Sequence, residues 1–513
     1  MREEKSFRHA VKWAYVMQGS EQGLNALFTF IFAALLGPRD FGTVAMAMAY
    51  ILFIKLVLEQ GFLPALVARK DLRKEHLDSV FWLNISLSLV LVILSVGFSR
   101  WWAHVNHLPA LAPIITVLSL ALFLEGLTIV QKAVLERALD FKSFSIRSII
   151  ANLVGGTVGL AMAFKGFGVW ALVGKQLTTD FLGLIVLWKL SHWRPGFSFS
   201  RKAVEDLLGY SLGSFTGNLG VWVNSQIDTL IIGLFFGPVP VGLYRLAGRV
   251  PYMIVTGTTS SLQAAAFPQF CRIQEKPGEL RQSVLSCFRV ASILSIPALA
   301  GLAVISKPLL SILGPKWADA STAMVILCFA AMVQPIALFT APLLQSVSKT
   351  HLLAVIEWGN AALLASSIAM VGEMLKNHRA LDQVTGIAAT RLLTTFGIFL
   401  PFIIWVFRRF AGVSVSSTLK ALMPGVLAAG IMATVVLAFS AFASHFGASL
   451  SVTLGTEITL GALTASGIVL CLDPRLRSSV TGFLANFKRA GLKVWPEEST
   501  TPPPGGSPGV TKT

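Results

Sequence analysis

The sequence predicts an all-α polytopic membrane protein with about 14 transmembrane helices. Of its 513 residues, 54% are hydrophobic and only 13% are charged, and the mean hydropathy is +0.71. A soluble domain carries about 25% charged residues, so this chain lacks the polar surface that a soluble fold needs. Apolar stretches long enough to cross a bilayer also recur along almost the whole chain. Composition therefore excludes a soluble protein.

A bilayer crossing requires about 20 consecutive, mostly apolar residues. On this criterion the spans fall at 14–36, 41–67, 78–99, 109–134, 146–164, 167–190, 206–236, 239–267, 284–305, 320–346, 352–372, 384–407, 419–443 and 450–472. The connections between them are short, so we expect no separate outer domain. The tail 473–513 ends in EESTTPPPGGSPGVTKT and is predicted to be disordered, because this composition cannot build a packed core.

The basic residues predict the orientation of the spans. The chain has 42 Lys and Arg against 25 Asp and Glu. Most of those between spans fall on the side of the N-terminus, RKDLRKEH at 69–76 being one example. The positive-inside rule therefore places both termini in the cytoplasm and explains the excess without nucleic acid. The charged N-terminus, MREEKSFRHAVKW, lacks the apolar core and cleavage site of a signal peptide.

A short pattern occurs twice in the chain. Residues 35–42 read LLGPRDFG and residues 235–242 read FFGPVPVG, each between two predicted helices. Six spans separate the two copies, and an even number gives both copies the same direction in the membrane. Parallel repeats of this kind occur in secondary transporters, which bind substrate at the interface between the repeats. The pattern therefore predicts two like halves with a site between them.

Four stretches resemble a known family: LLGPRDFG continuing into FGTVAMAMAY, EQGFLPALVARKD, VLERALDFKSFSIR and IDTLIIGLFFGPVPVGLYRLAGR. Across about residues 5–410 the chain is similar to the polysaccharide-transport (Wzx-like) flippases of the multidrug/oligosaccharidyl-lipid/polysaccharide exporter superfamily. The resemblance implies an N-lobe of helices 1–6 (1–200), a C-lobe of helices 7–12 (201–412) and two added helices (413–472). It also implies a central cavity that opens alternately to either face of the membrane.

Charged residues within the spans are candidates for substrate binding. A charge near the bilayer centre costs about 2.5–3.5 kcal/mol on insertion scales, so each needs a partner or a wet cavity. Arg245 and Arg249 lie four apart on one helix face and repel each other. If Asp228 pairs with one, the other is left for a diphosphate, which a guanidinium binds well. The alternative is that both arginines extend toward lipid headgroups.

Helices 1 and 2 carry further candidates. Lys55 and Glu59 can form an i,i+4 ion pair, and we expect this pair either to line the cavity or to be purely structural. Glu21 and Asn25 lie with Gln22 on a polar stripe of helix 1. Such groups either join helices by hydrogen bonds or carry ions. We predict substrate contact for Asn25 and ion coupling for Glu21, because a carboxylate in a low dielectric exchanges protons readily.

Structural pairing is favoured for five further charges within spans, which are Glu125, Lys132, Lys175, Asp180 and Arg391. The four cysteines are widely scattered and the histidines show no ligand spacing. We therefore predict no disulfide framework, no metal site and no cofactor.

The predicted function is that of a flippase. The resemblance implies that it moves an isoprenoid-diphosphate-linked oligosaccharide across a bacterial plasma membrane for surface polysaccharide export. Membrane lipids and a polysaccharide polymerase or export machinery are the candidate partners. The first alternative is an antiporter for organic cations, which Glu21, Glu59 and Asp228 would suit. The second is a membrane-embedded glycan polymerase, ligase or glycosyltransferase, and the lack of a large loop for catalytic residues argues against any enzyme.

Overall fold

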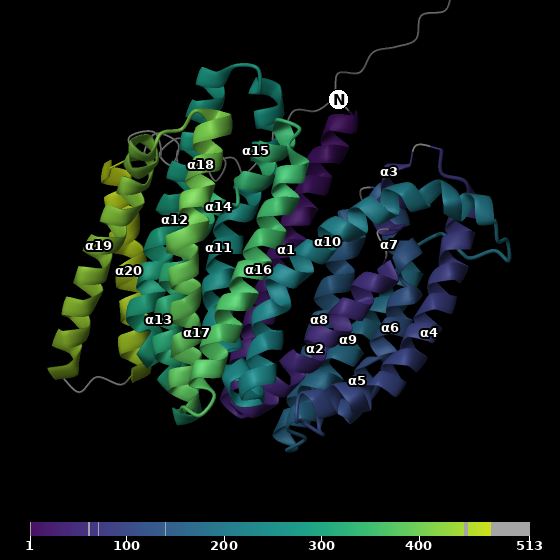
Figure 1. The fold of residues 1–513 in the computed structure, drawn as a ribbon, viewed down its shortest axis with the longest axis horizontal. Coiled ribbons are helices and arrows are strands. Elements are labelled where there is room, and N and C mark those ends of the chain that lie inside the picture. The colour runs from purple at the N-terminus through teal and green to yellow at the C-terminus, as the bar shows by residue number, and fades with distance from the viewer. Residues whose placement is uncertain (1, 60–61, 70, 139, 446–449, 473–513) are drawn as a thin grey trace, which may run out of the picture.

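The computed structural model describes residues 2–59, 62–69, 71–138, 140–445 and 450–472, and every regular element in these ranges is helical (Figure 1). The predicted disordered tail, 473–513, lies outside the described residues. The helices are α1 (Arg2–Leu35), α2 (Pro38–Glu59), α3 (Phe62–Ala68), α4 (Lys74–Val105), α5 (Leu111–Leu118), α6 (Leu120–Gly126), α7 (Ile129–Arg137), α8 (Phe141–Phe164), α9 (Val169–Leu190), α10 (Arg201–Phe236), α11 (Pro238–Ile273), α12 (Pro277–Ile312), η1 (Pro315–Trp317), α13 (Ala320–Ala331), α14 (Gln334–Ala337), α15 (Thr340–Ser346), α16 (Thr350–Leu375), α17 (Ala380–Thr394), η2 (Thr395–Phe399), α18 (Leu400–Ala411), α19 (Val415–His445) and α20 (Leu450–Leu472).

The all-α membrane fold is confirmed, but the count of 14 spans is not. Among the described residues, 11 helices are long and apolar enough to cross a membrane, or 12 if a bent pair forms one span. The predicted spans 14–36 and 239–267 correspond to α1 and α11, which are outside this set. Both are long enough, at 34 and 36 residues. Their hydropathy is reduced by the polar and charged side chains that the sequence analysis singled out.

Two groups of helices lie on either side of a central set (Figure 1). On one side α8 packs against α9, and α4 packs against α5 and α6. On the other side α12 packs against α13 and α19, and α19 packs against α20. Between them α2 contacts both α10 and α11, while α1 packs against α8. The lobe boundaries near residues 200 and 412 remain a prediction.

The two Gly-Pro turns of the repeat face each other at one end of the bundle. In both, a helix ends before the glycine and the next helix begins at the proline, which suits the first turn because it has no N–H to pair. A Cβ on Gly42 would collide with the carbonyl oxygen of Pro238, and a Cβ on Gly242 would collide with that of Pro38. These reciprocal contacts relate the two segments by a local twofold axis.

A second contact closes the same end of the bundle. Trp317, which is fully buried, donates from Nε1 to the carbonyl oxygen of Ala33 at 2.7 Å. Nζ of Lys316 donates to the carbonyl of Ala34 at 2.9 Å. The ring of Phe41 meets Trp317 edge-on, with 5.4 Å between centroids. The end that the basic residues predict to be the outer one is therefore sealed by both halves of the chain.

Candidate functional site: cations between the two halves

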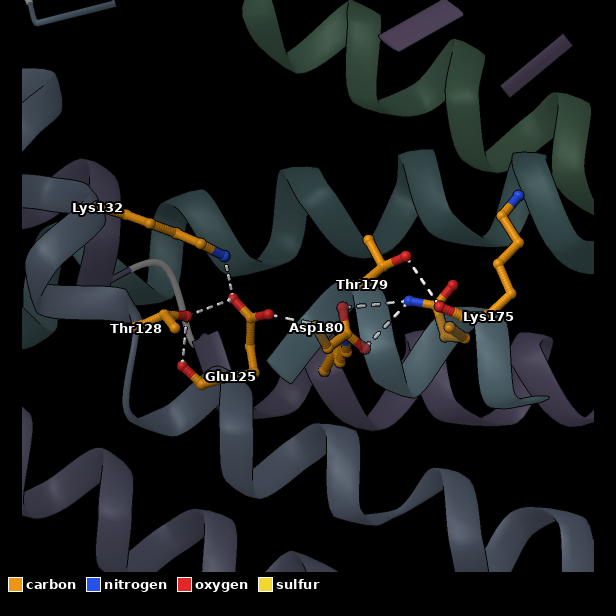
Figure 2. A network of polar contacts seen from close by, with 8 residues as sticks. Glu125, Thr128, Lys132, Lys175, Thr179 and Asp180 are labelled. Carbon is orange, nitrogen blue, oxygen red and sulfur yellow. Dashed lines mark hydrogen bonds and ion pairs between the residues drawn. The ribbon is translucent and has the colours of Figure 1, made fainter. Parts of the chain in front are cut away.

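A network of ion pairs lies inside the first half of the chain, and Figure 2 shows it from close by. Nζ of Lys55 in α2 lies 3.6 Å from Oε2 of Glu125 in α6 and 3.6 Å from Oδ2 of Asp180 in α9. Lys132 in α7 pairs with the other oxygen of Glu125. Two lysines thus balance two carboxylates, and we call these four residues the Lys55 network.

The Lys55 network confirms one predicted pair and corrects another. Glu125 and Lys132 pair as expected. Lys55, however, pairs with Glu125 and Asp180 rather than with Glu59. Two neighbouring helices, α6 and α9, place carboxylates near Lys55, so the i,i+4 partner on its own helix is not needed. Lys55 and Lys132 attract Glu59 electrostatically, but no ion pair joins Glu59 to either lysine.

Lys175 does not take part in the Lys55 network, although it lies on the same helix as Asp180. Figure 2 shows its side chain directed away from Asp180. The ammonium group lies 5.6 and 5.7 Å from the ring centroids of Phe28 and Phe32 in α1. It has no carboxylate partner among the described residues. The structural pairing predicted for Lys175 is therefore not found among the described residues. Asp180 is not its partner, because five residues turn a helix by about 140° and separate the two side chains.

Asp228 pairs with a residue that the sequence analysis did not connect to it. One of its carboxylate oxygens accepts a hydrogen bond from the Tyr244 hydroxyl at 2.8 Å and forms an ion pair with Arg391 of α17. The predicted pairing of Asp228 with Arg245 or Arg249 is thus wrong. Asp228 lies in α10, and α11 packs against both α10 and α17, so Tyr244 of α11 and Arg391 of α17 reach the same carboxylate oxygen. This confirms structural pairing for Arg391.

Arg245 and Arg249 form no ion pair with any carboxylate of the described residues. Arg245 donates to Oε1 of Gln226, and its Nε atom is buried without a hydrogen-bond acceptor. Arg249 has neither an ion pair nor a hydrogen bond within the part of the chain that the structure describes. Asp228 attracts Arg245 electrostatically without forming an ion pair with it, while the two arginines repel each other and Arg249 also repels Lys175 of the first half. We call Lys175, Arg245 and Arg249 the interlobe cation cluster.

The interlobe cation cluster has the chemistry of an anion site. Arg249 repels both Arg245 on its own helix and Lys175 of α9, and all three groups are on helices of the predicted spans, where water does little to screen repulsion. A polyanion placed among them removes the repulsion and gains charge-assisted hydrogen bonds. Arg245 and Arg249 were predicted from the sequence. Lys175 was missed, although its spacing from Asp180 carries the signal that the two cannot pair.

The polar stripe of α1 contains groups with few partners. Glu21 accepts a hydrogen bond from the Ser148 hydroxyl of α8. The buried Oε1 atom of Gln22 has no hydrogen-bond partner, and the Asn25 side chain makes no hydrogen bond within the described ranges. Glu21 therefore joins two helices, while its predicted role in ion coupling remains a prediction. So does the predicted contact of Asn25 with substrate.

The second half of the chain holds a polar group that the sequence analysis missed. Glu357 of α16 accepts a hydrogen bond from the Asn224 side chain at 2.8 Å, and Asn360 donates to Asn224 at 2.9 Å. A carboxylate within the predicted span 352–372 is itself a signal, because such groups are rare in membranes. Glu357 thus contacts α10 from its position on α16, and no cation pairs with it in the described part of the chain.

A comparison with protein families places the chain. The model of a family described as "Polysaccharide biosynthesis protein" matches residues 31–322, which is more than half of the chain. The chain belongs to this family. The match includes the Gly-Pro repeat, the Lys55 network and the whole interlobe cation cluster. Arg391 and Glu357 lie beyond it.

Individual relatives of this polysaccharide biosynthesis family are distant but cover much of the chain. The succinoglycan biosynthesis transport protein ExoT of Rhizobium meliloti is 26% identical over 62% of this chain and 64% of its own length. The teichuronic acid biosynthesis protein TuaB of Bacillus subtilis is 22% identical over 83% of this chain and 88% of its own length. The chain therefore spans a little under two thirds of the first relative and most of the second.

Solved structures show the same fold at low identity. The lipid II flippase MurJ, in an inward closed conformation, superposes with a TM-score of 0.70 at 13% identity, over 91% of this chain and 99% of MurJ. An inward-facing multidrug resistance MATE family transporter of the MOP superfamily gives a TM-score of 0.58 at 16% identity, over 76% and 95%. The family match confirms the predicted resemblance to polysaccharide-transport proteins, and the two solved structures show that the chain shares their fold.

Proposed function

We propose that this protein is a flippase that moves an isoprenoid-diphosphate-linked oligosaccharide from the inner to the outer leaflet by alternating access. The observation that carries the proposal is the interlobe cation cluster. It presents positive groups from both halves of the chain that form no ion pair with a carboxylate in the part that the structure describes. A diphosphate supplies the missing negative charge, while an organic cation would be repelled. The family match and the transport proteins among the relatives support the same class of activity.

The mechanism follows from electrostatics. In the empty protein, Lys175 and Arg249 repel each other across the boundary between the two halves. A bound diphosphate removes this repulsion and so shifts the balance between the inward-open and outward-open states. The seal formed by Gly42 and Gly242 then opens at the outer end. The sugars cross within the space between the halves, and the isoprenoid chain remains in lipid.

The flippase proposal extends to location and partners. We place the protein in a bacterial plasma membrane with both termini in the cytoplasm, because basic residues concentrate on that side. A polysaccharide polymerase or an export complex on the outer side would consume the delivered glycan. The protein itself acts on no covalent bond in this proposal. Accessibility of single cysteines placed at Arg39 and at Arg201 to a membrane-impermeant reagent tests the orientation.

The test of transport uses purified protein in vesicles with a fluorescent isoprenoid-diphosphate glycan in one leaflet. Movement to the other leaflet is followed by a quencher that cannot cross the membrane. We expect Arg249→Gln and Lys175→Gln each to slow this movement at least tenfold. The control is Arg408→Gln, which removes one charge from an exposed site at the end of α18. If the parent protein leaves the glycan in place and expels an organic cation, the antiporter alternative replaces this proposal.

A further inference from the structure

A groove on the first half of the chain lies apart from the interlobe cation cluster. It has a volume of about 430 Å³ and is lined by Leu127, Leu184, Ile185, Trp188, Lys189 and Arg194. The groove has a structural cause. The span made of α5, α6 and α7 bends by 43° between Gly126 and Ile129, next to the last turns of α9. The bend leaves a space between α7 and α9 that side chains do not fill.

The lining of this groove combines apolar walls with two cations. Leu127, Leu184, Ile185 and the Trp188 ring form the walls. Lys189 is exposed and has no ion pair or hydrogen bond among the described residues. Lys189 and Arg194 are at the end of α9 that the basic residues predict to be cytoplasmic. A site of this kind suits a molecule with an acyl chain and an anionic headgroup.

Direct contacts hold the groove in shape. The Trp188 Nε1 atom donates to the carbonyl oxygen of Leu127 at 3.0 Å and so fixes the bend against α9. The Arg194 guanidinium lies over the Trp188 ring, 5.8 Å from its centroid. Its Nη1 atom donates to the carbonyls of Ser191 and Trp193 at 2.6 and 2.9 Å. The Trp188 ring and the two carbonyls thus hold the Arg194 guanidinium in place. Its Nε and Nη2 groups remain available to a phosphate.

We propose that this groove binds an anionic phospholipid of the inner leaflet. One acyl chain lies against Leu127, Ile185 and Trp188, and the headgroup phosphate binds Lys189 and Arg194. The transported substrate is a poorer fit to this position. Leu184 and Trp188 lie on the side of α9 roughly opposite to Lys175, because nine and thirteen residues turn a helix by about 180° and 220°. The groove therefore opens on the side of α9 that points away from the interlobe cation cluster.

The test measures lipid contact at Trp188 in the full-length protein. The protein is placed in phosphatidylcholine vesicles that contain either brominated phosphatidylglycerol or the same fraction of brominated phosphatidylcholine. The contribution of Trp188 is the fluorescence of the parent protein minus that of the Trp188→Phe variant. We expect the brominated phosphatidylglycerol to quench Trp188 more strongly. Each cation near a membrane surface contributes about 1 kcal/mol, so Lys189→Ala/Arg194→Ala should weaken this binding about 30-fold.

Two further variants make the result specific. Arg408→Ala/Arg409→Ala removes two exposed cations from the end of α18 and should leave the quenching unchanged. Leu184→Phe narrows the groove without changing its charges, and it should reduce the quenching. Equal quenching by both brominated lipids would overturn the proposal. An equal loss of quenching in both double variants would also overturn it. That result would mean that the anionic lipid responds to the overall surface charge and not to the groove. Displacement of phosphatidylglycerol by a much lower concentration of an isoprenoid diphosphate would assign the groove to the substrate instead.

Discussion

Gly42 of α2 and Gly242 of α11 pack backbone against backbone, each beneath the carbonyl oxygen of the proline that begins the other's helix. No side chain fits between the two helices at this point. The contact joins the two halves at the end that is closed here, where Trp317 also binds the end of α1. Alternating access requires this end to open. Gly42 and Gly242 therefore allow a close contact that must also be broken in each transport cycle.

Gly42→Ala should weaken the seal. The added methyl group would meet the Pro238 carbonyl, and overpacking of this kind costs about 1–3 kcal/mol. We expect Thr43→Cys, placed beside the contact in a protein without native cysteines, to react faster with an outside maleimide reagent. Gly430→Ala in α19 is the matched control, since nothing lies within 4 Å of its added Cβ. Equal labelling rates in both variants would show that the contact does not hold the outer end closed.

Asp228 and Arg391 should behave as a structural pair. Asp228→Asn leaves the Arg391 charge without its carboxylate in a membrane-spanning segment, and breaking a buried pair costs about 3–5 kcal/mol. The thermal midpoint of unfolding in detergent should therefore fall sharply. Asp228→Leu/Arg391→Met, which removes both charges, should recover most of the loss. A normal midpoint for Asp228→Asn together with lost glycan binding would instead make Asp228 part of the substrate site.

The sequence predicted what depends on local pattern. Apolar length located the spans, and the Gly-Pro repeat indicated two like segments that proved to be in contact. The partner of Asp228 was out of reach, because Arg391 is 163 residues away and no spacing rule selects one helix from several. The partners of Lys55 come from two other helices for the same reason. Lys175 differs from these cases, because its helical angle from Asp180 was readable from the sequence alone.

Lys55 should contribute to stability rather than to substrate binding. Lys55→Met leaves Glu125 paired with Lys132, but it removes the ion partner of Asp180 and leaves that carboxylate with only the Gln176 side-chain amide. We expect a lower thermal midpoint with unchanged affinity for a diphosphate-linked glycan. Glu59→Gln should change neither quantity much, since Glu59 pairs directly with no lysine of the network. Lost glycan affinity in Lys55→Met at an unchanged midpoint would return Lys55 to the substrate site.

Acid should loosen an exposed contact between the segment after α3 and the start of α10, ahead of the membrane-spanning part Asn218–Phe236. Arg69 Nη2 donates to Asp206 Oδ2 at 2.8 Å, and this hydrogen bond lowers the pKa of Asp206. His76 Nε2 lies 3.7 Å from the same oxygen and adds attraction when protonated. Because the pKa of Asp206 is lowered in the folded protein, the contact is complete at neutral pH. It is lost as the pH falls through that lowered value.

Amide hydrogen exchange in the first two turns of α10, corrected for the intrinsic effect of pH, measures this loosening. Protection should fall in acid for the parent protein. Asp206→Asn should already have low protection at neutral pH and change little with acid. Glu205→Gln is the matched control, because Glu205 pairs only with Arg201 on its own helix and should retain the parent's profile. Protection that stays constant in the parent protein down to strongly acid pH would mean that the Asp206 carboxylate does not hold these segments together.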